Sequence, residues 1–290
     1  MSLWQRKGFR IMIRILVDSS ADFEMHEIKE LKMDFIPISV TLGEENYKDG
    51  VDLNKDKLYE MLAGTELFPK TAQPSPADFV EIFEEVKNSG DELIYLSLSS
   101  GLSGTYQSAM LAKSMVEYDG IYLVDSLTAT HVIRILAEYA VRLREEGLAC
   151  KDIVAKLESV KSRCKVIAGL DTLEFLCRGG RVSRAAAAIG ELANLKPIIS
   201  VSEEGKIKVI GKCVGRLKAT SFLIKQLEDM GVDTAFPLYT IYTYGTENVE
   251  KLEEKLAKAN VNVAGRQQIG ATVGAHVGPG AFGMVFVEKA

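Results

Sequence analysis

A run of small hydroxyl residues and glycines follows an apolar segment near the middle of the chain. Residues 93–98 have the composition of a buried strand, and residues 109–115 carry apolar side chains at helical spacing. Ser99, Ser100, Gly101 and Ser103 lie between them. The first backbone N–H groups of a helix lack internal partners, so this connection is suited to holding an anion. The alternative is that Ser99 or Ser100 only caps the helix.

The same connection nearly matches the nucleophile elbow of hydrolases. Residues 101–105 read Gly-Leu-Ser-Gly-Thr, so a threonine stands where the G-x-S-x-G motif has its last glycine. Ser103, Asp171 and His276 follow one another in the chain order of an α/β-hydrolase triad. A serine hydrolase of acyl esters that uses Ser103 and His276 is therefore one hypothesis.

Two other side chains could donate hydrogen bonds to an anion. His276 lies in a glycine-rich segment, residues 270–283, where we expect a turn with no helix face to fill. Thr71 lies in a loop just before a well-marked helix start at Ser75 and Pro76, although a solvated hydroxyl is the alternative reading. Residues 278–283 match G-x-G-x-x-G, but a strand follows them, so we reject a dinucleotide site.

Arginines gather around a pair of glycines in the second half of the chain. Arg178, Arg181 and Arg184 flank or follow Gly179-Gly180, and Arg216 has a similar setting between a loop and a helix. Guanidinium groups suit a phosphate or an acidic partner surface. The alternative is that these arginines only form the solvated surface of helices and cap their C-termini.

The elements that must position these residues divide the chain into two parts. Up to Leu170, strand-like runs alternate with helical patterns, which predicts a parallel sheet flanked by helices with ligands bound beyond the carboxyl ends of its strands. The later part contains a predicted antiparallel hairpin, residues 197–202 with 206–213. We therefore predict an α/β protein with an N-terminal α/β domain, residues 12–170, and a C-terminal α+β domain with a largely antiparallel sheet, residues 171–290.

Composition excludes several classes of function. The 290 residues carry a net charge of −5, which argues against nucleic acid or an anionic membrane as the main partner. We expect no integral membrane segment, because no apolar run is long enough to span a bilayer. The four cysteines lack C-x-x-C spacing and the three histidines fall in unrelated elements, so we expect no metal site and no disulfides. Unpaired thiols fit the cytoplasm.

Six motifs in one order give the chain a resemblance to the DegV family of bacterial fatty-acid-binding proteins. The resemblance runs from about Met12 to the C-terminus, and six spaced motifs are far more specific than any one of them. The motifs are Val17-Asp18-Ser19-Ser20, Lys70-Thr71-Ala72-Gln73-Pro74, the run from Leu98 to Tyr106, Gly179-Gly180-Arg181-Val182-Ser183, Lys196-Pro197-Ile198, and the run from Gly274 to Gly280.

The resemblance implies a carrier rather than an enzyme. The best understood members are binding subunits of a two-component fatty acid kinase, so it implies a long-chain fatty acid such as palmitate or oleate in a buried tunnel. A separate kinase subunit would phosphorylate its carboxylate to an acyl phosphate, and no cofactor is expected besides the bound fatty acid. The carboxylate contacts of the family fall on Thr71, Ser103 and His276. We assign supporting roles to Ser100, Gly101 and Gly274, and docking of the partner or of phosphate to Arg181 and Arg216.

Simple energetics agree with a fatty acid ligand. A C16 chain brings about fourteen methylenes, and burying them at roughly 0.8 kcal/mol each contributes about 11 kcal/mol before ordering costs. The chain has no Walker A motif, so ATP would bind elsewhere. A binding protein for another amphipathic anion, with no kinase partner, is a third hypothesis.

Overall fold

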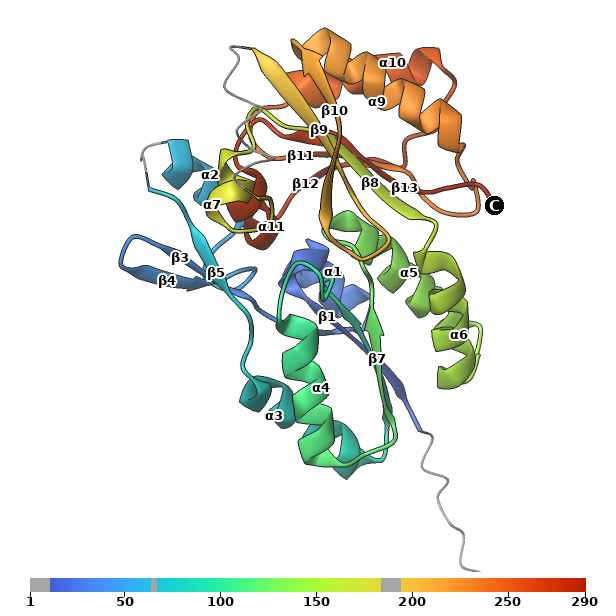
Figure 1. Ribbon diagram of the computed structural model, residues 1–290. Coiled ribbons are helices and arrows are strands. Elements are labelled where there is room, and N and C mark those ends of the chain that lie inside the picture. The colour runs from blue at the N-terminus through green and yellow to red at the C-terminus, as the bar shows by residue number, and fades with distance from the viewer. Residues whose placement is uncertain (1–10, 64–66, 184–193) are drawn as a thin grey trace, which may run out of the picture.

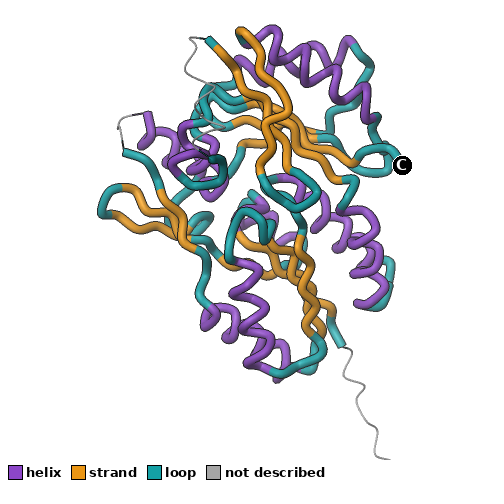
Figure 2. The backbone as a smooth tube through the Cα atoms, in the orientation of Figure 1, coloured by secondary structure: helices purple, strands orange, loops and turns teal. Residues whose placement is uncertain are grey.

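The computed structural model describes residues 11–63, 67–183 and 194–290, and its strands form three sheets (Figures 1 and 2). The first sheet has four parallel strands in the order β2-β1-β6-β7, as the alternation of strands and helices predicts. Successive side chains of β1 and β6 point to opposite faces, and both faces are buried. Its strands are β1 (Ile13–Asp18), β2 (Asp34–Ile36), β6 (Glu92–Ser97) and β7 (Ile121–Asp125).

Helices cover both faces of this sheet. On one face, α3 and α4 pack over Leu16, Leu93 and Tyr95, while on the other α5 packs over Ile15 and Ile94. A short 3₁₀ helix η1 (Ser19–Ala21) follows β1 directly. The helices of this part are α1 (Met25–Glu30), α3 (Pro76–Ser89), α4 (Thr105–Val116), α5 (His131–Glu145) and α6 (Cys150–Lys161).

The second sheet has six strands in the order β10-β9-β8-β13-β11-β12 and is antiparallel except between β11 and β12. The predicted hairpin is confirmed as β9 and β10. One face is covered by α9 and α10, at the top of Figure 1, and the other packs against α5, which therefore contacts both large sheets. The elements are β8 (Cys164–Gly169), β9 (Leu195–Val201), β10 (Ile207–Val214), β11 (Tyr239–Tyr242), β12 (Gly265–Gln268), β13 (Phe282–Val287), α9 (Arg216–Met230) and α10 (Glu247–Lys258).

The strand β8 corrects one expectation. We predicted it in the N-terminal parallel sheet, but it lies between β9 and β13 in the second sheet, antiparallel to both. Its sequence marks a buried strand without specifying which strands pair with it. The six-stranded sheet thus begins in the chain at Cys164, whereas the domain boundary between residues 170 and 171 stays a prediction.

Residues 35–42, one of the strand-like runs that precede Leu170, correct a second expectation: they belong to two short strands separated at Pro37 and not to a single strand. Proline has no N–H for a ladder hydrogen bond, and the chain leaves the first sheet there. The second strand joins a small antiparallel sheet in the order β4-β3-β5, on the left of Figure 1. This sheet contains β3 (Ser39–Leu42), β4 (Glu45–Lys48) and β5 (Lys70–Ala72), and the helix α2 (Lys55–Ala63) lies between β4 and β5 in the chain.

The glycine-rich segment is the third correction, because it contains a helix, α11 (Ala271–Val277), where we expected a turn. Gly270 is its N-cap, and Gly278, with a φ of 72°, ends it. Two of the glycines therefore lie at the ends of the helix and do not interrupt it. The helix α7 (Glu174–Arg178) ends at the glycine pair, while Arg184 lies outside the described residues. No helix in the described ranges is long and apolar enough to cross a membrane.

Candidate functional site

A pocket lies where the small sheet, α11, α7 and the loop before α4 meet. Four of the residues singled out in the sequence line it, and each comes from a different element: Thr71 from β5, Ser103 from the loop before α4, Arg181 from the loop after α7, and His276 from α11. The rest of the lining is almost entirely apolar and consists of Ile38, Leu98, Leu102, Ala129, Leu176, Ile207, Thr272, Val273 and Val277. The arrangement combines a polar end with an apolar interior.

Thr71 and His276 form a hydrogen-bonded pair at the polar end. The Thr71 Oγ1 atom lies 2.9 Å from His276 Nε2, although the two residues are 205 positions apart in sequence. Burial, and secondarily the charge of Arg181, lowers the pKa of His276 to about 4. The imidazole is therefore neutral at pH 7. Its Nδ1 has no hydrogen-bond partner among the described residues and lies against Gly179.

Ser103 lies in the turn that leads into α4. Its Oγ is 2.8 Å from Thr105 Oγ1 and accepts a hydrogen bond from the Thr105 N–H at 3.3 Å. The turn is fixed further by the Ser99 hydroxyl, which donates to the carbonyl of Gly205 at 2.7 Å. The tip of the β9–β10 hairpin thus holds the loop that carries Ser103.

The hydrolase hypothesis requires contacts that the described residues do not make. Asp171, its third member, forms an ion pair with Lys196 at 2.7 Å and a longer one with Arg216 at 3.4 Å. His276 bonds to Thr71, and Ser103 bonds to Thr105, so no hydrogen bond in the described ranges joins the three proposed triad residues. This geometry gives Ser103 no general base.

Arg181 supplies a positive charge next to the polar end. The side chain is half buried, its Nε donates to the carbonyl of Leu102 at 2.9 Å, and burial lowers its pKa. No carboxylate in the described part of the chain is paired with it. An outer groove shares Thr71, Arg181 and His276 with the pocket and adds Lys70 and Arg178, so the polar end is reachable from outside.

The remaining predicted residues lie outside the pocket. The N–H of Ser100 donates to Asp125, and Gly101 lines a neighbouring groove with Arg181. Gly274 is within α11, where the ring of Tyr59 packs so closely that an added Cβ would lie 2.3 Å from its hydroxyl oxygen. Arg216, at the start of α9, is exposed apart from its contact with Asp171.

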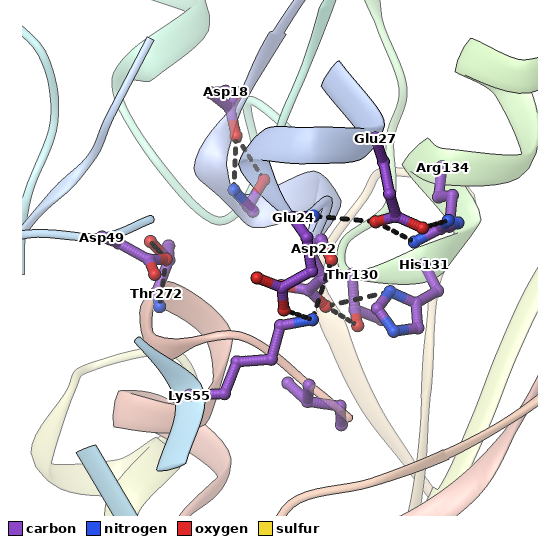
Figure 3. A network of polar contacts seen from close by, with 12 residues as sticks. Asp18, Asp22, Glu24, Glu27, Asp49, Lys55, Thr130, His131, Arg134 and Thr272 are labelled. Atoms are coloured by element: carbon purple, nitrogen blue, oxygen red, sulfur yellow. Dashed lines mark hydrogen bonds and ion pairs between the residues drawn. The ribbon is translucent and has the colours of Figure 1, made fainter. Parts of the chain in front are cut away.

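Sequence reasoning missed the buried polar residues behind the pocket. Asp49 accepts hydrogen bonds from Thr272, and Asp22 accepts one from the hydroxyl of Thr130 and lies near His131 (Figure 3). Asp49-Gly50 shows in the sequence only as a turn signal, and nothing in the sequence pairs it with Thr272, 223 positions away. In residues 11–63, 67–183 and 194–290 no group of three or more metal-ligating side chains could hold an ion.

Comparison with known proteins decides the family. A profile described as an uncharacterised protein of the DegV family matches residues 12–289. The chain belongs to the DegV family. A DegV domain-containing protein of Caldanaerobacter subterraneus is 36% identical over 279 residues, covering 96% of this chain and 99% of the relative.

Solved structures of DegV proteins have the same fold. The fatty-acid-binding DegV family protein of Thermus thermophilus aligns with a TM-score of 0.86 and 28% identity over 96% of this chain and 100% of its own. The stearic-acid-binding protein of Eubacterium ventriosum aligns with a TM-score of 0.83 and 26% identity over 96% of this chain and 99% of its own. The three-sheet α/β architecture described above is therefore the DegV fold.

Proposed function

We propose that this protein binds a long-chain fatty acid and presents its carboxylate to a separate kinase subunit. The observation that carries the proposal is the single pocket in which Thr71, Ser103 and His276 meet an apolar interior. DegV proteins similar to this one over nearly their whole length are described as binding fatty acids, stearic acid among them. A linear amphiphile with one anionic end matches a pocket of this polarity.

The head group would be held by short donors from three elements. The hydroxyls of Thr71 and Ser103 and one N–H of a neutral His276 are enough for two carboxylate oxygens. A buried carboxylate without such partners is costly, and the guanidinium of Arg181, which pairs with no carboxylate among the described residues, offsets part of that cost. We infer that the acyl chain supplies most of the affinity and the head group supplies the orientation.

The outer groove gives a kinase access to the bound carboxylate. Thr71, Arg181 and His276 face both the pocket and the groove, so one carboxylate oxygen could attack the terminal phosphorus of ATP held by the partner. The oxygen–phosphorus bond forms as ADP leaves, and an acyl phosphate remains on the carrier. The cationic Lys70 and Arg178 at the groove suit an approaching phosphate. We place this reaction in the cytoplasm, where the free thiols stay reduced.

Native mass spectrometry of the purified protein tests the proposal first. We expect a bound species with the mass of a fatty acid at about one per chain, identified after extraction under denaturing conditions. A protein that carries no lipid and takes up neither palmitate nor oleate would contradict fatty acid binding. Turnover of a chromogenic ester that is lost in Ser103→Ala would instead support the hydrolase.

A second measurement tests the kinase step separately. The loaded protein is mixed with a fatty acid kinase subunit and ATP, and acyl phosphate is trapped with hydroxylamine. Fatty acid binding without any acyl phosphate would favour a binding protein that has no kinase partner.

A further inference from the structure

The helix α11 forms a large part of the pocket wall, and its N-terminus lacks a cap of its own. Thr272, Val273, His276 and Val277 all line the pocket. The N-cap residue is Gly270, which has no side chain to accept a hydrogen bond from the first N–H groups. Asp49, from the turn after β4, takes that place. Its Oδ2 accepts the Thr272 N–H at 2.8 Å and the Thr272 hydroxyl at 2.6 Å (Figure 3).

Asp49 also connects α11 to a second part of the pocket wall. Its own N–H donates to the carbonyl of Ile38 at 3.0 Å, and Ile38 lines the pocket. The N–H of Ile38 donates to Ser19 Oγ at 3.0 Å, and Ser19 Oγ lies 2.9 Å from Thr272 Oγ1. Hydrogen bonds thus run from Ile38 through Ser19 and Thr272 to the carboxylate of Asp49. These four residues join the two parts of the pocket wall that Thr272 and Ile38 provide.

Asp49 differs from an ordinary helix cap, because its carboxylate is buried. Asp49 is only 4% exposed, and no cation in the described part of the chain pairs with its carboxylate. Burial raises its pKa, and the hydrogen bonds from Thr272 oppose that shift. An exposed cap, such as Ser75 on α3, stabilises a helix without this desolvation cost.

We propose that Asp49 is a positioning residue for the head-group site. Thr272 and His276 are four residues apart on one helix and so share a face one turn apart. Holding Thr272 sets the depth at which His276 Nε2 meets Thr71 Oγ1. This inference rests on the proposed function, since it assigns Asp49 to the recognition of the fatty acid carboxylate.

The test compares the binding of palmitic acid with that of methyl palmitate, each displacing a fluorescent fatty acid. The two ligands share the chain and differ in the charged head group, so the ratio of their affinities isolates head-group recognition. In Asp49→Ala we expect this ratio to fall at least tenfold while the affinity for the ester stays within about twofold. Asp49→Asn keeps an acceptor in place and should retain most of the ratio. Asp49→Glu keeps the charge but moves the acceptor, so this variant should lose most of the affinity ratio.

The controls separate the possible failures. Ser75→Ala removes a cap from α3 at a residue that lines neither the pocket nor the outer groove, and it should lower stability with no change in the ratio. If Asp49→Ala does not fold, the contrast between the Asn and Glu variants decides. A ratio that is unchanged in Asp49→Ala, or equally lost in the Asn and Glu variants, would overturn the positioning role. A wild-type protein with no preference for the acid over the ester would instead contradict the proposed function itself.

Discussion

A neutral imidazole at the polar end of the pocket is the residue-scale feature with the clearest consequence. Burial lowers the pKa of His276 to about 4, whereas an unfolded chain has a histidine pKa near 6.5. Between these values the unfolded state binds more protons than the folded state. Folding stability contributed by this residue is therefore complete above about pH 6.5 and is lost as the pH falls toward 4.

Replacing His276 with glutamine should flatten that dependence. The amide does not titrate, so acidification from pH 6.5 to 4 should cost the lipid-free variant less stability than it costs the wild type, by up to about 3 kcal/mol. Chemical unfolding of both proteins at pH 7, 5.5 and 4.5 measures the difference. Parallel stability profiles would show that His276 is not buried in its neutral form.

Ser103 should contribute to binding of the carboxylate head group and not to recognition of the acyl chain. In Ser103→Ala one hydrogen bond to a charged oxygen is lost, which costs about 1.5 kcal/mol, or roughly tenfold in affinity for a fatty acid. The preference among chain lengths should be unchanged, because the apolar lining is intact. Displacement assays with acids of different length provide both numbers. Ser114→Ala on the exposed face of α4 is the matched control, and an effect of equal size there would remove Ser103 from the site.

At the scale of elements, the close approach of α7 to α11 shapes the site. A Cβ added to Gly179 would lie 2.3 Å from His276 Nδ1, so Gly179→Ala must displace the imidazole. The backbone φ of Gly179 is −72°, so alanine meets no backbone strain there. We expect at least tenfold weaker fatty acid binding with little loss of stability.

Gly90→Ala is the control, because its strain lies in the backbone and not in a contact. Gly90 has a φ of 75°, which alanine rarely adopts, and no atom lies near the new Cβ. This variant should therefore lower stability by about 1 kcal/mol and leave binding unchanged. Binding assays and thermal unfolding of both variants separate the two effects. Unchanged binding in Gly179→Ala would mean that α7 can move away from His276 at no cost.

The elements also show how far the sequence predicts this fold and where it fails. Regular alternation of strands and helices predicts the parallel sheet, and the hairpin around Gly205 follows from local turn chemistry. The partners of β8 and the helical state of α11 depend on contacts distant in sequence, such as those of Asp49 with Thr272 and of Tyr59 with Gly274 in α11. Hydroxyl and imidazole donors can be recognised in the sequence as candidates. Their meeting in one pocket follows from packing across both parts of the chain.

For the whole molecule, the site lies where three sheets come together. The small sheet brings Thr71, the loop after the parallel sheet brings Ser103, and α11, which precedes the last strand of the six-stranded sheet, brings His276. The helix α5 contacts both large sheets and keeps them in one packed unit. A ligand that contacts all three donors therefore bridges the two large sheets, which α5 also holds together, and the small sheet as well. Ligand binding is thus expected to stabilise the protein as a whole, by mass action.

Arg216 allows binding and presentation to be tested apart. It lies outside the pocket, its side chain is 44% exposed, and its contact with Asp171 is 3.4 Å long, so it is available to an acidic partner surface. In Arg216→Ala we expect unchanged affinity for palmitate and at least threefold slower acyl phosphate formation at limiting kinase concentration, because loss of one charge weakens the complex. Lys225→Ala, on the exposed surface of the same helix, is the charge-matched control. Equal rates for the wild type and both variants would show that α9 does not face the kinase, and would favour the groove around Lys70 and Arg178 as the kinase-facing surface.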